Sequence, residues 1–154
     1  MQAMKSALLC ASLSLALAAP TWAQMSRSGC AVVNIADATN ILGPGTEQRE
    51  MGGNCIYGSK DATTAITANL TPDAGTPFNV MKFTSAQNSA IVKDEPTIGE
   101  YAFSVTPKEG TGFTIFLLKG NWGATIALST GNKKATELQK AAMRRLAKSA
   151  MSKM

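Results

Sequence analysis

The sequence predicts one α+β domain over residues 24–154: an antiparallel sheet of about five or six strands, a short N-terminal helix, and a long C-terminal helix packed on one face. Three observations predict this fold class. Apolar and polar residues alternate with a period of two in 62–70, 101–105 and 122–128. Apolar residues recur with a helical period from about Lys133 to Met151. The length of 154 residues suits a single domain, and no linker-like segment divides the chain.

Residues 1–23 have the pattern of a secretory signal peptide. A lysine at position 5 precedes an apolar run from Ala7 to Ala19, and small residues follow before Gln24. The run is shorter than the roughly 18 to 20 residues that span a bilayer, which favours a cleaved signal over a membrane anchor. We expect cleavage before Gln24, with a cut after Ala18 as the alternative. The expected location is therefore the periplasm or the extracellular space.

The short N-terminal helix is expected from Asn34 to Leu42. Asn34 is a favourable N-cap, and Asp37 lies in the first turn, where the helix dipole stabilises an acid. Gly43 supplies a left-handed C-terminal residue, and Pro44 prevents the helix from continuing.

Local signals predict the segments between this helix and the last one. In chain order they are a polar loop Gly45–Asn54, a strand Cys55–Tyr57, a helix opening at Thr76-Pro77 with Phe78 and Met81 on one face, a strand Ile91–Val92, a central strand Phe113–Leu118 and a hairpin turn Gly120–Asn121.

Two cysteines remain after the expected cleavage, since Cys10 lies in the signal peptide. An even pair in an exported chain predicts a disulfide between Cys30 and Cys55. Closing a loop of about 26 residues would stabilise the fold by roughly 3 to 4 kcal/mol on the chain-entropy account. Two free buried thiols are the alternative.

The C-terminal helix holds all of the net positive charge. Residues 132–154 carry seven basic residues and one acid, whereas 24–131 carry seven basic and nine acidic residues. We expect an apolar stripe against the sheet, made of Ala135, Leu138, Ala142, Leu146 and Ala150, with Glu137, Lys140, Arg144 and Lys148 opposite. One hypothesis is that an anionic surface binds through Lys140, Arg144, Arg145 and Lys148. The alternative is a packed helix whose cations are simply solvated.

The residue inventory favours a non-catalytic role over an enzyme. The chain contains no histidine, which removes Ser-His, Cys-His and His-metal arrangements. We expect no catalytic site, no cofactor, no metal site and no nucleic-acid partner. The acids Asp94, Glu95, Glu100 and Glu109 leave a histidine-free carboxylate hydrolase as an alternative.

Several segments together resemble a broad group of small bacterial exported domains of unknown function. They are Cys30 with its apolar run, Leu42-Gly43, Cys55-Ile56-Tyr57, the segment Ile98 to Phe103, the Lys119-Gly120 hairpin and the closing helix. Some members of that group are lipoproteins, whereas this sequence lacks a lipidation cysteine. The resemblance implies an α+β fold and assigns no activity. We therefore expect an exported domain that binds a ligand, a protein partner or an envelope component, with at most peripheral membrane contact.

Overall fold

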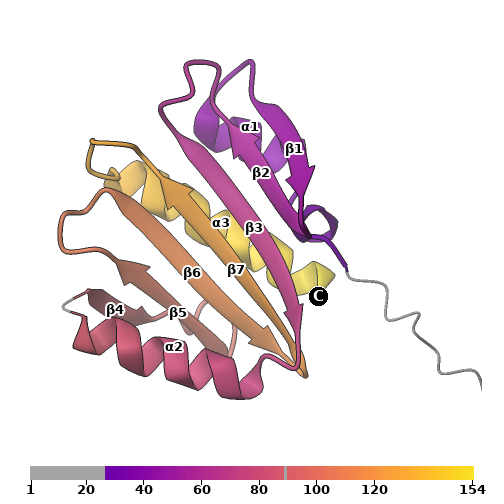
Figure 1. Ribbon diagram of the computed structural model, residues 1–154, viewed down its shortest axis with the longest axis vertical. Helices are drawn as coiled ribbons and strands as arrows, with labels where there is room; N and C mark the ends of the chain where they lie inside the picture. The colour runs from indigo at the N-terminus through magenta and orange to yellow at the C-terminus, as the bar shows by residue number, and fades with distance from the viewer. Residues whose placement is uncertain (1–26, 89) are drawn as a thin grey trace, which may run out of the picture.

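The computed structural model describes residues 27–88 and 90–154, and the expected signal peptide lies outside these residues. The fold is α+β, with one seven-stranded antiparallel sheet between helices (Figure 1). The elements are a 3-10 turn Gly29–Ala31, α1 (Ile35–Leu42), β1 (Glu47–Met51), β2 (Asn54–Gly58), β3 (Ala65–Pro72), α2 (Gly75–Gln87), β4 (Ile91–Asp94), β5 (Tyr101–Thr106), β6 (Gly112–Lys119), β7 (Trp122–Ser129) and α3 (Glu137–Lys153).

The sheet consists of two antiparallel meanders with the strand order β1-β2-β3-β7-β6-β5-β4. After β3 the chain crosses the sheet through α2 and starts again at the far edge with β4. Strands β4 to β7 then return towards the middle, where β7 pairs with β3 over eight residues from Ala65↔Ser129 to Pro72↔Trp122. The Gly120-Asn121 turn between β6 and β7 is confirmed, since Lys119 pairs with Trp122.

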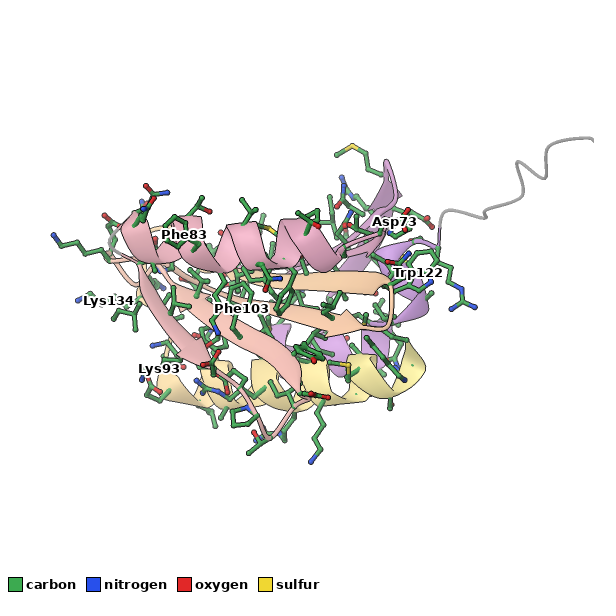
Figure 2. The ribbon with its side chains drawn as sticks, turned by 90° about the horizontal axis from the view of Figure 1, so that it is seen from below. Asp73, Phe83, Lys93, Phe103, Trp122 and Lys134 are labelled. Carbon is green, nitrogen blue, oxygen red and sulfur yellow. A yellow bond between two sulfur atoms is a disulfide. The ribbon has the colours of Figure 1, made fainter. Side chains whose placement is uncertain are left out.

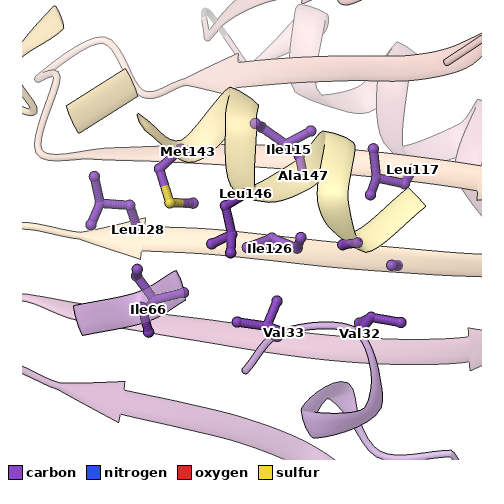
Figure 3. Packing of buried hydrophobic residues seen from close by; sticks show 14 of the residues in the cluster. Val32, Val33, Ile66, Ile115, Leu117, Ile126, Leu128, Met143, Leu146 and Ala147 are labelled. Atoms are coloured by element: carbon purple, nitrogen blue, oxygen red, sulfur yellow. The ribbon is translucent and has the colours of Figure 1, made fainter. Parts of the chain in front are cut away.

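Helices cover both faces of the sheet, with α3 and α1 on one face and α2 on the other (Figure 2). We call these the α3 face and the α2 face. The main core lies on the α3 face, where Met143, Leu146, Ala147 and Ala150 of α3 belong to the same buried cluster as the side chains of the central strands (Figure 3). Those strand residues are Ile66, Ile115, Leu117, Ile126 and Leu128.

The α2 face has a smaller aromatic core. Phe78 of α2 contacts Phe103 edge-on at a centroid distance of 4.9 Å, and Phe103 stacks on Phe116 at 4.7 Å. Helix α2 can approach because Gly123 has no side chain: a Cβ there would lie 2.4 Å from the Cβ of Ala74. The helix begins at Gly75, slightly before the expected start at Thr76-Pro77, and extends to Gln87.

Strand β1 replaces part of the expected polar loop and makes the seventh strand. All five of its residues are exposed, so no apolar alternation marks it. Gly52 and Gly53, both with positive φ, form the two-residue turn that pairs Met51 with Asn54. Such a turn matches the twist of a hairpin, which favours strands on either side of it. The charged residues of β1 also protect this edge of the sheet from pairing with other chains.

The prediction for α1 is confirmed. The Asn34 side chain accepts a hydrogen bond from the Asp37 backbone N–H at 2.8 Å, and Gly43 follows the helix with a φ of 90°. The preceding turn is joined to β2 by the disulfide between Cys30 and Cys55, whose Cα atoms are 5.0 Å apart. Beside it, the buried hydroxyl of Tyr57 donates to the Val33 carbonyl at 2.5 Å. Burial, with a smaller contribution from the negative charge of Asp37, raises the pKa of Tyr57 to about 12.

Helix α3 begins later than predicted, and its predicted apolar stripe is only partly confirmed: Leu146 and Ala150 are buried, whereas its first turn faces solvent. Thr136 and Gln139 form a capping box, while the Ala135 N–H donates to the Gly110 carbonyl at 2.8 Å, outside the helix. Leu138, expected in the core, is 77% exposed. At about 100° per residue, Leu138 points about 140° away from Met143, whose side chain is fully buried.

This helix rotation also corrects the expected polar face. Arg144 points towards the sheet, with its guanidinium 5.0 Å from the centroid of the Phe113 ring. The side chain of Lys140 is also largely covered, with only 17% of its surface exposed. Lys148 and Glu137 are exposed as expected.

We predict that the same substitution affects stability strongly at one leucine of α3 and hardly at all at another. Leu146→Asp should destabilise the fold by about 3 kcal/mol or more, because it buries an unpaired carboxylate at a site that is 4% exposed. Leu138→Asp should change the free energy of unfolding by less than about 0.5 kcal/mol, as is usual for exposed sites. Urea unfolding followed by circular dichroism measures both. A large loss of stability in Leu138→Asp would contradict the orientation of α3.

We also predict that Cys30 and Cys55 are oxidised in protein purified without reductant. Peptide mapping after alkylation under denaturing conditions should recover them as one linked pair. Reduction should lower the stability by about 3 kcal/mol, since the bridge closes a loop spanning 25 positions. The double variant Cys30→Ser/Cys55→Ser should show the same loss and no response to reductant. Quantitative labelling of both thiols without reductant would refute the bridge.

Candidate functional site

A groove of about 540 Å³ opens at the C-terminal end of α3. We call it the α3 groove. Three segments line it: the loop after β4 with the start of β5, the β6–β7 turn, and the last turns of α3. The lining residues are Ile98, Gly99, Glu100, Tyr101, Leu118, Lys119, Gly120, Lys148, Met151 and Ser152.

The loop that forms one wall of the groove is held by its backbone. The Glu95 N–H donates to the Ala102 carbonyl at 2.9 Å, and the Ile98 N–H donates to the Glu95 carbonyl at 3.0 Å. Ile98 is buried, and Gly99 lies so close to α3 that a Cβ there would be 2.6 Å from the Met151 methyl carbon. This wall is therefore defined before any ligand binds.

The opposite wall brings two lysines to the groove. Lys119, at the end of β6, donates from Nζ to the Met151 carbonyl at 3.1 Å and so caps the last turn of α3. Lys148 is exposed and contributes a second positive charge from the helix itself. Glu100 is the one acid that lines this groove among the described residues.

Tyr101 stands at the mouth of the groove with about half of its surface exposed. A hydrogen bond with Glu100, reinforced by the negative charge of that residue, raises the pKa of the Tyr101 hydroxyl. The tyrosine is thus neutral throughout the physiological range and presents an aromatic ring with a hydrogen-bonding end. Together with Ile98, Leu118 and Met151 it gives the groove an apolar floor and a charged rim.

A second polar cluster lies near the middle of α3, at the edge of the sheet. The carboxylate of Glu95, which is 7% exposed, accepts from the Ser104 hydroxyl at 2.7 Å. Both of its oxygens also accept from Arg144 Nε, at 2.9 and 3.0 Å. A buried carboxylate needs such partners, because an unpaired one would cost several kcal/mol. This cluster joins α3 to the loop that walls the groove.

The four basic residues proposed for anionic surfaces do not form one patch. Arg144 is paired with Glu95, and Lys140 donates to Glu137 at 2.8 Å. Arg145 lies beside α1, where it lines a shallow hollow with Asp37 and Asn40. Lys148 lines the α3 groove. Sequence reasoning identified this lysine and missed the apolar lining, whose residues are far apart in the chain.

The four acids considered for a hydrolase do not lie together in one site. Asp94 forms an ion pair with Lys82 of α2, whereas its neighbour Glu95 pairs with Arg144 of α3 on the other face. Glu100 and Glu109 flank the two ends of β5, a strand of six residues and about 20 Å. The carboxyl pairs of glycosidases are at most about 9.5 Å apart, so Glu100 and Glu109 do not have that geometry. Asp94 and Glu95 are each held in an ion pair on opposite faces of the sheet.

The described residues form a small α+β domain with an open amphipathic groove at the end of α3. Comparisons with protein-family models, curated proteins and solved structures give no match. Within residues 27–88 and 90–154, no helix has the length and apolar character to cross a bilayer. No group of three or more cysteine or acidic side chains is placed to hold a metal ion in the same part of the chain.

The Arg144–Glu95 pair gives a direct prediction. Arg144→Met should destabilise the fold by about 2–3 kcal/mol, because it leaves the buried Glu95 carboxylate without its cation; Arg144 is itself one-third exposed, which limits the loss. The double variant Glu95→Met/Arg144→Met should recover most of that stability, since it removes both charges together. Urea unfolding of the two variants tests this. If the single and double variants lose the same free energy of unfolding, Arg144 stabilises the fold through packing and not through its charge pair with Glu95.

Proposed function

We propose that this protein is an exported, non-catalytic binding domain whose α3 groove takes a small amphipathic molecule with an acidic group. The observation that carries the proposal is the composition of the groove: an apolar floor flanked by lysines from two different elements. Its volume of about 540 Å³ lies within the range of about 300–1,000 Å³ that is typical of small-molecule sites.

The charge balance of the groove favours an anionic ligand. Lys119 and Lys148 oppose one acid, Glu100. A carboxylate, sulfate or phosphate at the rim would replace some of the water around the lysines, while its apolar part would cover Leu118 and Met151. Burial of apolar surface contributes about 25 cal/mol per Å², so the apolar part supplies affinity and the lysines supply orientation.

Export is supported by the disulfide and by the composition of the N-terminal segment. A bridge between Cys30 and Cys55 is stable in oxidising compartments and rare in the cytosol. Residues 1–23 have the charge and hydropathy pattern of a signal peptide. A small domain outside the cytosol, with a groove of this kind, suits capture of a ligand in the envelope.

Docking onto an anionic surface through the exposed side of α3 is the second candidate. It is favoured by the concentration of positive charge in residues 132–154, and by Arg145 and Lys148 on the exposed side of the helix. Exposed Leu138 lies on the same helix. This mode would depend steeply on salt, because its attraction is between solvated charges.

One experiment separates the two candidates. We expect decanoate, titrated below its critical micelle concentration at 0.1 M salt, to shift the backbone amides of residues 98–101 and 118–120 in a saturable way. Lys148→Gln should weaken this binding about three- to tenfold, which corresponds to the loss of one partly screened ion pair. Arg145→Gln, a change of charge on the same helix outside the groove, should leave it unchanged.

Two further probes, a cationic surfactant and anionic vesicles, distinguish binding in the groove from docking on a surface. Decyltrimethylammonium should bind more weakly than decanoate if the groove selects an anion. If the protein sediments with phosphatidylglycerol vesicles, depends equally on Arg145 and Lys148 for this, and does not bind decanoate, then the binding site is the exposed side of α3 and not the groove. Absence of both kinds of binding would contradict both candidates.

A further inference from the structure

We propose that Lys93, Lys140 and Arg144 form a separate binding site for one tetrahedral oxyanion, a phosphate or a sulfate group, and that the Glu137 carboxylate, paired with Lys140, competes with that anion. The three cations line a hollow between β4, β5 and the first half of α3. We call it the cationic hollow. It does not depend on the α3 groove, which is formed by the other end of the helix.

Two of the three cations are held in place by the protein, and the third projects from an edge strand. Arg144 is clamped between the Phe113 ring, 5.0 Å from its guanidinium carbon, and the Glu95 carboxylate. Only its Nε takes part in those hydrogen bonds, so within the described residues its two Nη groups donate to no protein acceptor. The side chain of Lys140 is 17% exposed, and Lys93 projects from the α3 face of the edge strand β4 (Figure 2).

The negative charges at the hollow leave an excess of positive charge. Glu95 is satisfied by Arg144 and Ser104, so it acts as a support for the guanidinium. Glu137 is the acid that lines the hollow itself. With its side chain 83% exposed, it can turn into solvent without breaking any buried contact.

Glu137 shows that the hollow already attracts an anionic oxygen. Its carboxylate accepts from Lys140 Nζ at 2.8 Å. That hydrogen bond and the charge of Lys140 lower the pKa of Glu137, and Arg144 and Lys93 lower it further. Lys140 is the cation in contact with this carboxylate, and Lys93 and Arg144 line the same small hollow. A phosphate or sulfate, with more oxygens and more charge, could accept hydrogen bonds from all three cations.

The size of the hollow restricts the ligand to a small ion or a terminal group. Its volume is about 80 Å³, well below the roughly 300 Å³ at which small-molecule sites begin. The Thr106 hydroxyl, which donates to no other described residue, adds a neutral donor to the lining. Free phosphate or sulfate fits this space, as does the end of a phosphate monoester whose remainder stays in solvent.

Titration with inorganic phosphate, followed by amide chemical shifts at constant ionic strength, tests the proposal. We expect saturable shifts at residues 91–93, 104–106 and 137–144. Glu137→Gln should tighten phosphate binding about three- to fivefold, since it removes the competing charge while keeping the side-chain shape. Lys93→Gln and Lys140→Gln should each weaken it at least about threefold.

Lys133→Gln is the matched control, because Lys133 is exposed near the same end of α3 and does not line the hollow. It should change the phosphate affinity less than twofold. Lys93 is exposed, so its variant also remains informative if Lys140→Gln lowers stability.

Linear shifts spread over many lysines, or an affinity unchanged in Glu137→Gln, would overturn the proposal. Phosphoserine, titrated in parallel, tests whether the hollow accepts the end of a phosphate monoester. If it does, phosphoserine should bind as well as inorganic phosphate; if the hollow takes only the free ion, inorganic phosphate alone should bind. Neither of these results depends on decanoate binding in the α3 groove.

Discussion

The packing of α3 on the central strands determines where every other feature of this protein lies. Met143, Leu146, Ala147 and Ala150 form a narrow stripe with helical spacing, and the stripe lies against Ile115, Leu117 and Ile126 (Figure 3). Two of the four residues are alanines, which lets the helix approach the sheet closely. Larger residues at these positions would move the helix outward and open both the groove and the cationic hollow.

Contacts at three points fix the helix along and around its axis. Arg144 pairs with Glu95 near the middle, and Lys119 caps the last turn through the Met151 carbonyl. Lys153 reaches both the Val32 carbonyl and the carboxylate of Asp37, each at 3.4 Å. Arg144 and Lys153, two of the seven basic residues in 132–154, are therefore paired with acids of the protein itself. This lowers the charge that the helix presents to partners below what the sequence alone indicates.

The remaining functional features follow from the position of the helix. Its end contributes Lys148 and Met151 to the groove, and its first half contributes Lys140 and Arg144 to the hollow. The two sites suit different ligands, because one has an apolar floor and the other is small and polar. A single rigid helix thus connects them, and a ligand in either site would stabilise the same packing.

Sequence reasoning predicted the features that depend on local signals. The Asn34 cap, the disulfide, and the alternating patterns of β3, β5 and β7 all depend on residues close to one another or on cysteine count. Strand β1 was missed because it is exposed on both sides and shows no alternation. The stripe predicted for α3 is confirmed at Leu146 and Ala150 and wrong at Leu138, which suggested that the stripe continued into the first turn. The stripe of Met143, Leu146, Ala147 and Ala150 has equally good spacing, and only the tertiary packing selects it. The groove could not be predicted, since Ile98, Leu118 and Met151 are distant in the chain.

The orientation of α3 is the central claim, and methyl nuclear Overhauser effects test it most directly. In protein with labelled Ile, Leu and Met methyl groups, Leu146 and Met143 should show cross-peaks to the methyls of Ile115, Ile126 or Leu128. The Leu138 methyls should show none to the sheet. Cross-peaks from Leu138 to Ile115 or Ile126, with none from Met143, would mean that the helix presents its other side and that neither binding site exists as described.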